Sequence, residues 1–289
     1  MATDVRAATP VAKVRVARRS LGHDLRAVKI VLHRELLRFV YDRTRMVSQM
    51  IQPVLYLLVL GTGLGSLVSG GGNVDLKTFI FPGVLAMSVM FTGMFSAASI
   101  VWDREFGFLR EMLVAPVSRT AIVVGKVLGG AVVATFQGLV ILALAGLAGV
   151  PYDPGMLVML VVLMFAGAFT ITAFGVVLAA RIKKMQSFFG IMQMAMMPML
   201  FLSGAMFPLS GLPGWLSVLT RVNPLTYAVD PLRHEVFAHI SADARLKARF
   251  NPGVTWFGWH VPPVLEVGLV LALGVVLLGA AIAQFRRTD

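Results

Sequence analysis

The amino-acid sequence predicts an all-α polytopic membrane protein with six transmembrane helices. The chain of 289 residues is 57% hydrophobic and only 14% charged, whereas soluble domains carry about 25% charged residues. Six long intervals contain no Asp, Glu, Lys or Arg, namely 46–74, 78–102, 127–152, 154–180, 185–220 and 267–285. A helix of about 20 apolar residues crosses a hydrocarbon core of about 30 Å, so each interval is long enough for one span.

We place the spans at about 46–68, 79–101, 121–149, 156–180, 187–207 and 262–284. With this arrangement, twenty of the 26 Lys and Arg residues fall on one side of the membrane and six on the other. Basic residues are retained on the cytoplasmic side. Both termini are therefore expected in the cytoplasm. We expect the membrane itself to be a bacterial inner membrane. The net charge of +12 is explained by topology and attraction to lipid, and we expect no nucleic-acid partner.

The N-terminal region is expected to divide into two parts. We interpret residues 1–20 as a mobile basic arm. Residues 21–45 are predicted to form an amphipathic helix in the cytoplasmic interface. Its apolar positions follow helical spacing: Leu21, Leu25, Val28, Leu32, Leu36 and Phe39. Two interpretations stay open, a simple membrane anchor or an anchor whose polar face also docks a cytosolic partner.

The connection after the second span is longer than topology requires. Phe106, Leu109 and Leu113 have i, i+3, i+7 spacing, which predicts a short helix over about 103–115 that ends before Pro116. A two-turn helix is marginal alone in water. It packs either on the spans of its own chain or in a groove of a soluble partner.

The segment between spans five and six predicts two external half-helices, over about 208–235. They are separated at Asn223-Pro224, and each is too short to cross a bilayer. Both are too apolar for an exposed loop, so a re-entrant or interfacial position is expected. The nearby aromatic residues suit a belt at the outer interface. They are Trp215, Tyr227, Trp256 and Trp259.

The sequence contains neither an energy source nor a catalytic motif of its own. Gly125-Lys126 is followed by Val127, so the Ser or Thr of a phosphate-binding loop is missing. We expect Lys126 to snorkel to the cytoplasmic side and Glu266 to lie at the outer surface. There is no cysteine, and the scattered histidines predict no metal site. If the protein transports, its energy comes from another chain.

Two stretches resemble the type-2 ABC exporter permeases, most closely the daunorubicin and multidrug-resistance branch. The first is Asp103–Arg119, leading to Gly125-Lys126. The second combines Phe201–Pro208 with Asn223–Asp230. Many family members have Thr where this chain has Phe108, a departure that fits the drug-resistance branch. The six spans and the amphipathic N-terminal helix match over nearly the whole chain.

The resemblance implies a transport subunit, itself not an enzyme, in a permease homodimer or in a heterodimer with a similar permease. Two copies of a cytosolic ATPase subunit would bind ATP and Mg, and this chain would bind no cofactor. The coupling helix would include Glu105, Phe106, Gly107, Leu109, Glu111 and Leu113. The connecting helix would contact the ATPase through Arg34, Glu35 and Arg38. The external gate would include Pro208, Asn223, Pro224 and Tyr227.

The cargo is expected to pass along the seam between the two permeases. Candidate residues for this path are Gln137, Gln193, Met194, Met197 and Phe201. Buried amides more often mark helix contacts and methionines more often fill cores, but a flexible apolar wall favours amphipathic or hydrophobic cargo such as a drug, antibiotic or lipid. The alternatives are export of a polysaccharide or lipid-linked glycan, and an ATP-independent channel or scaffold.

Overall fold

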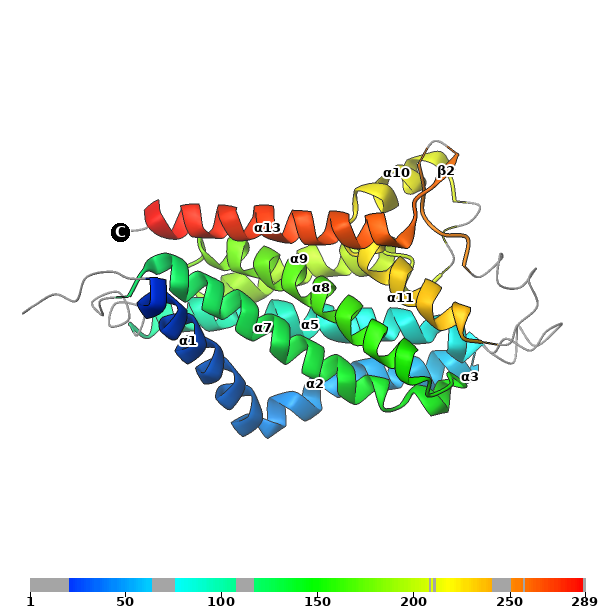
Figure 1. The fold of residues 1–289 in the computed structure, drawn as a ribbon, viewed down its shortest axis with the longest axis horizontal. Helices are drawn as coiled ribbons and strands as arrows, with labels where there is room; N and C mark the ends of the chain where they lie inside the picture. Colours follow the sequence, from blue (N-terminus) through cyan, green and yellow to red (C-terminus); the bar gives the residue numbers. More distant parts are fainter. Residues whose placement is uncertain are drawn as a thin grey trace, which may run out of the picture.

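The fold is that of a computed structural model that describes residues 21–63, 76–107, 117–207, 209, 212–240, 251–256 and 258–287. Within these ranges the chain is almost entirely helical (Figure 1). The helices are α1 (Leu21–Tyr41), α2 (Arg43–Leu55), the π-helical η1 (Tyr56–Leu60), α3 (Gly61–Gly63), α5 (Leu76–Glu105), α7 (Arg119–Leu142), the 3-10 turn η2 (Ala145–Ala148), α8 (Pro154–Ala179), α9 (Met185–Leu202), α10 (Gly214–Val222), α11 (Thr226–Ala238) and α13 (Pro263–Arg287).

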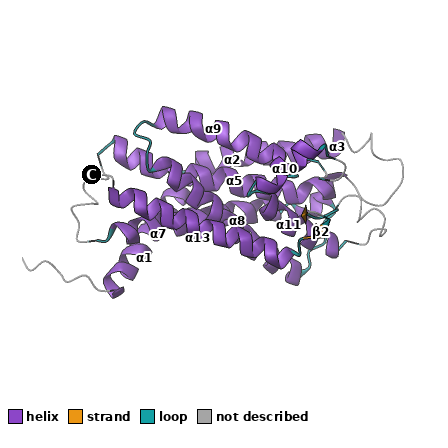
Figure 2. Ribbon diagram, turned by 90° about the horizontal axis from the view of Figure 1, so that it is seen from above, coloured by secondary structure: helices purple, strands orange, loops and turns teal. Residues whose placement is uncertain are grey.

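Among the described residues, six helical segments are long and apolar enough to cross a membrane. They are the continuous run α2–η1–α3, which spans Arg43–Gly63, and the single helices α5, α7, α8, α9 and α13. The predicted fold class is therefore confirmed. Neighbouring long helices run antiparallel and form an elongated bundle (Figures 1 and 2), as expected where short connections join successive spans.

Several element boundaries differ from the sequence prediction because of capping groups. The helix predicted over 21–45 ends at Tyr41, since the Asp42 side chain accepts a hydrogen bond from the Arg45 backbone N–H and caps α2. The predicted span 121–149 ends at Leu142 and is followed by η2. Gly149, with φ +69°, closes this turn. Asp153 caps α8, with Pro154 at its first position.

The bundle is built around α5. Its most apolar window is 83% buried, compared with 17% for Arg43–Gly63 and 22% for α9 and α13. The largest side chains of its core are fully buried: Phe79, Phe81, Leu85, Met87, Met90 and Met94. Gly83 permits a close approach, since a Cβ there would collide with the backbone of Ala205. α5 is therefore the central helix, and α2, α9 and α13 lie at the periphery.

The two ends of the bundle differ. One end, which we call the basic end, holds the start of α1 and the last turns of α5, α8 and α13 (Figure 1). The opposite end holds α10, α11 and a hairpin of β1 (Thr255–Trp256) and β2 (Trp259–His260), which pairs Trp256 with Trp259. The half-helices predicted over about 208–235 are thus observed as α10 and α11, whereas the hairpin was not predicted.

The expected aromatic belt is only partly exposed. Trp215 and Trp259 are 67% and 52% exposed. Tyr227 is buried and accepts a hydrogen bond from the Trp256 indole N–H at 2.9 Å. The burial of Tyr227 corrects its assignment to an exposed belt, because its ring packs edge-on against Trp256 and its hydroxyl donates to the Arg221 carbonyl oxygen at 2.6 Å.

Candidate functional site

A buried ion cluster joins three helices near the basic end. Lys126 on α7 donates to Asp103 at 2.7 Å and to Glu35 at 3.0 Å. It also donates to the Ser99 hydroxyl at 2.9 Å. Arg34 on α1 also donates to Asp103, at 3.0 Å. We call these five residues the ion cluster; it links α1, α5 and α7.

The local sequence explains how these side chains converge. Ser99 and Asp103 are four residues apart on α5 and therefore share one face of that helix. Lys126 lies two helical turns beyond Ser118, which caps α7. The two formal positive charges of the cluster balance its two negative charges. Because Lys126, Glu35 and Asp103 are 3%, 7% and 5% exposed, each of these ions depends on the others for its stability.

Two glycines allow α1 to approach α7 closely enough to complete the cluster. A Cβ on Gly125 would lie 2.8 Å from the Val31 Cβ. A Cβ on Gly129 would lie 3.0 Å from the Glu35 Cβ. Small residues four positions apart on one helix are a common way to bring helix backbones together in membranes. The pair explains why a carboxylate on α1 reaches a lysine on α7.

The prediction that Lys126 snorkels to the surface is wrong. Its ammonium group is enclosed by two carboxylates and a hydroxyl. These oxygens replace the water that the ammonium would otherwise reach by extending along the helix to the interface. Sequence analysis also missed Asp103 and Ser99 as site residues. The available signal was a lysine inside an otherwise apolar span, since such residues require a buried partner.

The predicted connecting-helix residues lie on α1 at this same place. Arg34 and Glu35 belong to the ion cluster. Arg38 places its guanidinium 5.6 Å from the ring centroid of Trp102, a cation–π contact. The structure thus brings these three residues together with the end of α5. Their predicted contact with an ATPase stays a prediction.

The predicted coupling residues are only partly described. Leu109, Glu111 and Leu113 lie outside the described residues. Glu105 is the last residue of α5, and its carboxylate accepts a hydrogen bond from the Met185 backbone N–H at 2.9 Å. Phe106 is 60% exposed, and Gly107 adopts a positive φ of +84° that favours glycine.

Arginines fasten the remaining helix ends at the basic end. Arg104 donates to the carbonyl oxygens of Ala179 and Ile182, which lie in the turn between α8 and α9. Arg119 donates to the last carbonyls of α13, those of Phe285 and Arg286. Cations suit the carboxyl ends of helices, where the backbone carbonyls are otherwise unpaired. The end of α5 and the start of α7 are therefore fastened to neighbouring helices.

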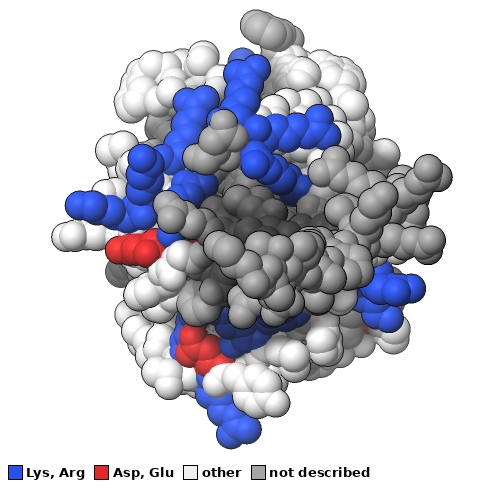
Figure 3. All heavy atoms as spheres, turned by 90° about the vertical axis from the view of Figure 1, so that its left-hand side faces the viewer, with Lys and Arg blue, Asp and Glu red and all other residues white. Residues whose placement is uncertain are grey.

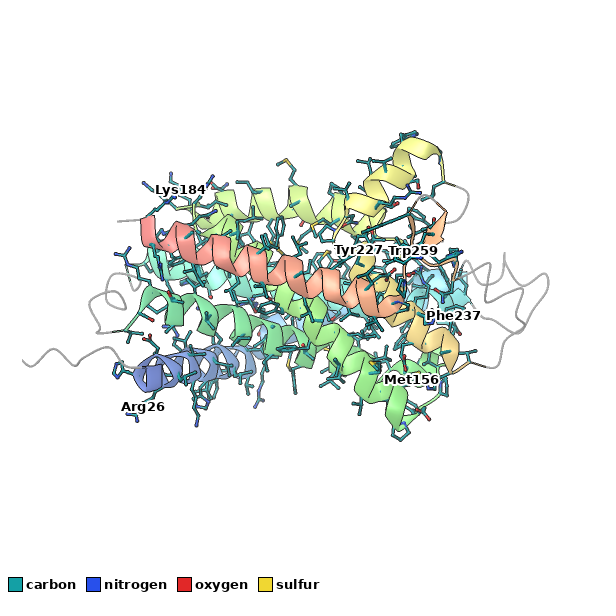
Figure 4. All side chains as sticks on the ribbon, turned by 45° about the horizontal axis from the view of Figure 1, so that its top comes forward. Arg26, Met156, Lys184, Tyr227, Phe237 and Trp259 are labelled. Carbon is teal, nitrogen blue, oxygen red and sulfur yellow. The ribbon has the colours of Figure 1, made fainter. Side chains whose placement is uncertain are left out.

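Exposed basic side chains crowd this end of the molecule (Figure 3). They include Arg26, Lys29, Arg181, Lys183, Lys184, Arg286 and Arg287. Figure 4 shows Arg26 and Lys184 at this end and Tyr227 and Trp259 at the other. The bundle is thus electrostatically polar along its length, with the ion cluster buried beneath its positive end.

Three of the four predicted external-gate residues are described, and they lie in the same region at the opposite end. Asn223 donates to the Met199 carbonyl oxygen at 2.7 Å, and its own amide oxygen accepts from the Leu225 backbone N–H at 3.1 Å. Pro224 follows in the turn between α10 and α11. Tyr227 bonds to the Arg221 carbonyl in the same region. Pro208 lies outside the described residues.

The candidate cargo-path residues divide into two groups. Gln137 is fully buried, and its amide N–H lies 3.5 Å from the Met46 carbonyl oxygen. The others lie on the exposed face of α9, where Met194, Met197 and Phe201 are 72%, 43% and 52% exposed and Gln193 is also exposed. The structure therefore groups the α9 residues on one surface and separates Gln137 from them.

The position predicted for Glu266 at the outer surface is wrong. Its side chain is 0% exposed in the first turn of α13, because α11 packs on α13 and places Asp230 near it. Among the described residues there is no group of three His, Asp or Glu side chains arranged to hold a metal ion.

The six spans, the apolar surfaces of the peripheral helices and the polar ends define a multi-pass α-helical membrane protein. Residues 26–237 match the family model described as "ABC-2 type transporter", and the chain belongs to this family. This result confirms the family resemblance seen in the sequence.

The chain is also similar to several named proteins. The chain is 28% identical over 200 residues to a putative transport permease, ycf38, of Cyanophora paradoxa, covering 68% of this chain and 69% of that protein. It is 32% identical over 161 residues to the probable multidrug ABC transporter permease YbhR of Escherichia coli K12, covering 55% and 43% respectively. It is 29% identical over 188 residues to nodulation protein J of Rhizobium leguminosarum bv. viciae, covering 64% and 72%. The chain is accordingly a membrane permease subunit.

Proposed function

We propose that this permease exports amphipathic or hydrophobic cargo, powered by two copies of a separate cytosolic ABC ATPase that binds ATP and Mg. The ion cluster is the observation that supports this proposal most strongly. It fastens α1 to α5 and α7 where α5 leads into the 108–116 connection. A force applied to that connection by a soluble partner would reach three helices together.

The charge asymmetry supports a cytoplasmic position for the basic end. Exposed Lys and Arg side chains gather there (Figure 3), and such residues are retained on the cytoplasmic side of membranes. Both the described start of α1 and the end of α13 lie at this end. In this orientation Phe106, just after the end of α5, would face the cytosol, where a cytosolic ATPase could contact it.

The exposed face of α9 supports the class of cargo. Met194, Met197 and Phe201 provide an adaptable apolar surface, and Gln193 adds a hydrogen-bonding group beside them. Among these four residues there is no formal charge to bind an ionic substrate. A drug, antibiotic or lipid-like molecule fits this surface better than a charged peptide.

Phe106→Asp tests the coupling. Phe106 is exposed, so a carboxylate there should leave the bundle folded while it removes apolar contact with the partner. We expect the variant to express normally but to lose cargo-stimulated ATP hydrolysis in a reconstituted complex. Glu105→Arg should have the same effect, although it also removes the acceptor for the Met185 N–H.

Trp259→Asp is the matched control, because it places the same charge at an exposed aromatic residue at the opposite end. Cargo should stimulate ATP hydrolysis in the Trp259→Asp complex as much as in the unsubstituted complex. Unchanged stimulation in Phe106→Asp would contradict the proposed coupling. Purification from native membranes without any ATPase would instead favour an ATP-independent channel or scaffold, and stimulation by lipid-linked glycan alone would favour polysaccharide export.

A further inference from the structure

Two buried carboxyl groups and one buried guanidinium meet where α11 packs on α13. Asp230 and Arg233 belong to α11, and Glu266 lies in the first turn of α13. They are 5%, 1% and 0% exposed. We call Asp230 and Glu266 the acid pair. Neither the coupling region nor the exposed α9 face involves these residues.

Arg233 and Asp230 connect α11 to its surroundings. The Arg233 guanidinium donates to the Gly204 carbonyl oxygen and lies 4.4 Å from the centroid of the Phe79 ring. Asp230 accepts a hydrogen bond at 3.3 Å from the backbone N–H of Val254, just before β1. Asp230 thus links α11 to the hairpin, while Arg233 links it to the turn after α9 and to α5.

Glu266 lacks such partners. Neither of its carboxyl oxygens has a hydrogen-bond partner among the described residues. The Asp230 carboxyl on α11 is its acidic neighbour. Two ionised carboxylates at this place would repel each other, so a proton on one of them is favoured. An unpaired carboxylate buried in this way would be strongly unfavourable.

The charges nearby do not remove this requirement. Burial raises the pKa of Asp230 despite the opposing effect of Arg233. Burial lowers the pKa of Arg233 to about 10, which leaves it protonated near neutral pH. Arg233 is thus a cation beside Asp230.

Other titratable groups surround the acid pair from the elements that pack on it. α11 contributes Tyr227 and His234. Arg221 of α10 accepts the Tyr227 hydrogen bond at its backbone carbonyl. His260 of β2 lies near Gly253, as Asp230 does. Asp153, at the start of α8, pairs instead with His239 at the far end of α11, 3.7 Å away.

We propose that the buried Glu266 carboxyl is a proton-binding site beside Asp230, and that its uncharged form allows α11 to pack against α13. The absence of a three-ligand cluster in the described part of the chain favours a proton over a metal ion as the ligand. Loss of the proton would leave two buried negative charges beside a single guanidinium. The resulting repulsion would loosen α11 from α13, independently of any transport activity.

Infrared spectroscopy of the full-length protein in lipid nanodiscs tests this site directly. A protonated carboxyl group gives a carbonyl-stretch band that is distinct from that of a carboxylate and shifts in deuterium oxide. We expect this band near neutral pH, its loss in Glu266→Gln, and its retention in Asp230→Asn, in which Glu266 stays buried without a partner. Asp153→Asn, at an exposed helix cap, should also retain it. Absence of the band in the unsubstituted protein, or its persistence in Glu266→Gln, would overturn the proposal.

Stability provides a second measurement with a definite sign. Because the folded acid pair binds its proton more tightly than the unfolded chain does, stability is greatest at lower pH and falls as pH rises toward the folded pKa. Thermal melting of the unsubstituted protein should therefore shift downward between about pH 6 and about pH 9. Glu266→Gln should flatten this shift, while Asp153→Asn should leave it unchanged. Equal slopes in all three proteins would refute the site; if Glu266→Gln does not fold, Glu266→Met, an uncharged side chain of similar length, serves in its place.

Discussion

At the scale of single residues, Lys126 shows how a charge is accommodated inside a membrane bundle. Its ammonium has three oxygen partners within 3.0 Å, two of them carboxylates. Replacing a whole buried ion group by apolar side chains is often neutral, whereas removing one member leaves uncompensated charge. The cluster therefore specifies the relative positions of α1, α5 and α7 more than it adds net stability.

Lys126→Met should destabilise the protein by about 3–5 kcal/mol, because Glu35 and Asp103 would remain buried with only Arg34 nearby. The free energy of unfolding in mixed detergent micelles measures this loss. Lys183→Met, at an exposed site of the same end, should change stability by less than about 0.5 kcal/mol. A Lys126→Met, Glu35→Gln, Asp103→Asn triple variant should recover much of the loss; similar stabilities for the two single variants would contradict the argument.

At the scale of elements, the position of α1 depends on the absence of side chains on α7. A Cβ on Gly125 or Gly129 would lie closer to Val31 or Glu35 of α1 than ordinary van der Waals contact allows. Any larger residue at these positions must move α1 outward. The predicted amphipathic face is consequently used in part for protein packing, since Phe39 is buried, whereas Leu25 is 70% exposed.

Gly125→Leu should displace α1 from α7 and increase tryptic cleavage of α1 after Arg26 and Lys29, both of which are exposed. Limited proteolysis followed by mass spectrometry measures the cleavage rate. Gly190→Leu is the control, because a Cβ at Gly190 on α9 meets nothing within 4 Å. Equal cleavage rates in the two variants would show that the glycine does not determine the position of α1.

At the scale of the whole molecule, the peripheral helices leave large apolar faces uncovered. The span Arg43–Gly63 and α9 are the least buried together with α13, and both pack on α5. The exposed α9 face includes the amide of Gln193, which is unfavourable against hydrocarbon unless it finds a polar partner. A second permease copy along α9 would provide one, and a permease dimer is what the family resemblance in the sequence implies.

Met194→Cys should therefore form a disulfide-linked dimer in native membranes under mild oxidation. The chain contains no cysteine of its own, so each variant has one thiol. Val276→Cys on α13 is the control, with a similarly exposed site, 66% compared with 72% for Met194. Dimer bands on non-reducing gels give the readout. Cross-linking through Val276 but not through Met194 would place the seam on α13.

The fold could be predicted from sequence to a much greater extent than the site. Intervals without charge gave the six spans, since burial in lipid excludes ions over a whole helix. The break at Asp42 was missed because a capping side chain interrupts an otherwise continuous periodicity. The ion cluster was missed because Glu35 and Lys126 are 91 positions apart. The burial of Glu266 was missed for the same reason, because its neighbours come from α11.

The contacts at the two ends of α9 have a mechanical consequence. Its first backbone N–H is held by Glu105, immediately before the 108–116 connection, and its Met199 carbonyl is held by Asn223 at the opposite end. A helix of 18 residues is a stiff rod about 27 Å long. An axial displacement of the Met185 end of α9 would thus be transmitted to its Met199 end, so α9 mechanically connects the two ends of the bundle.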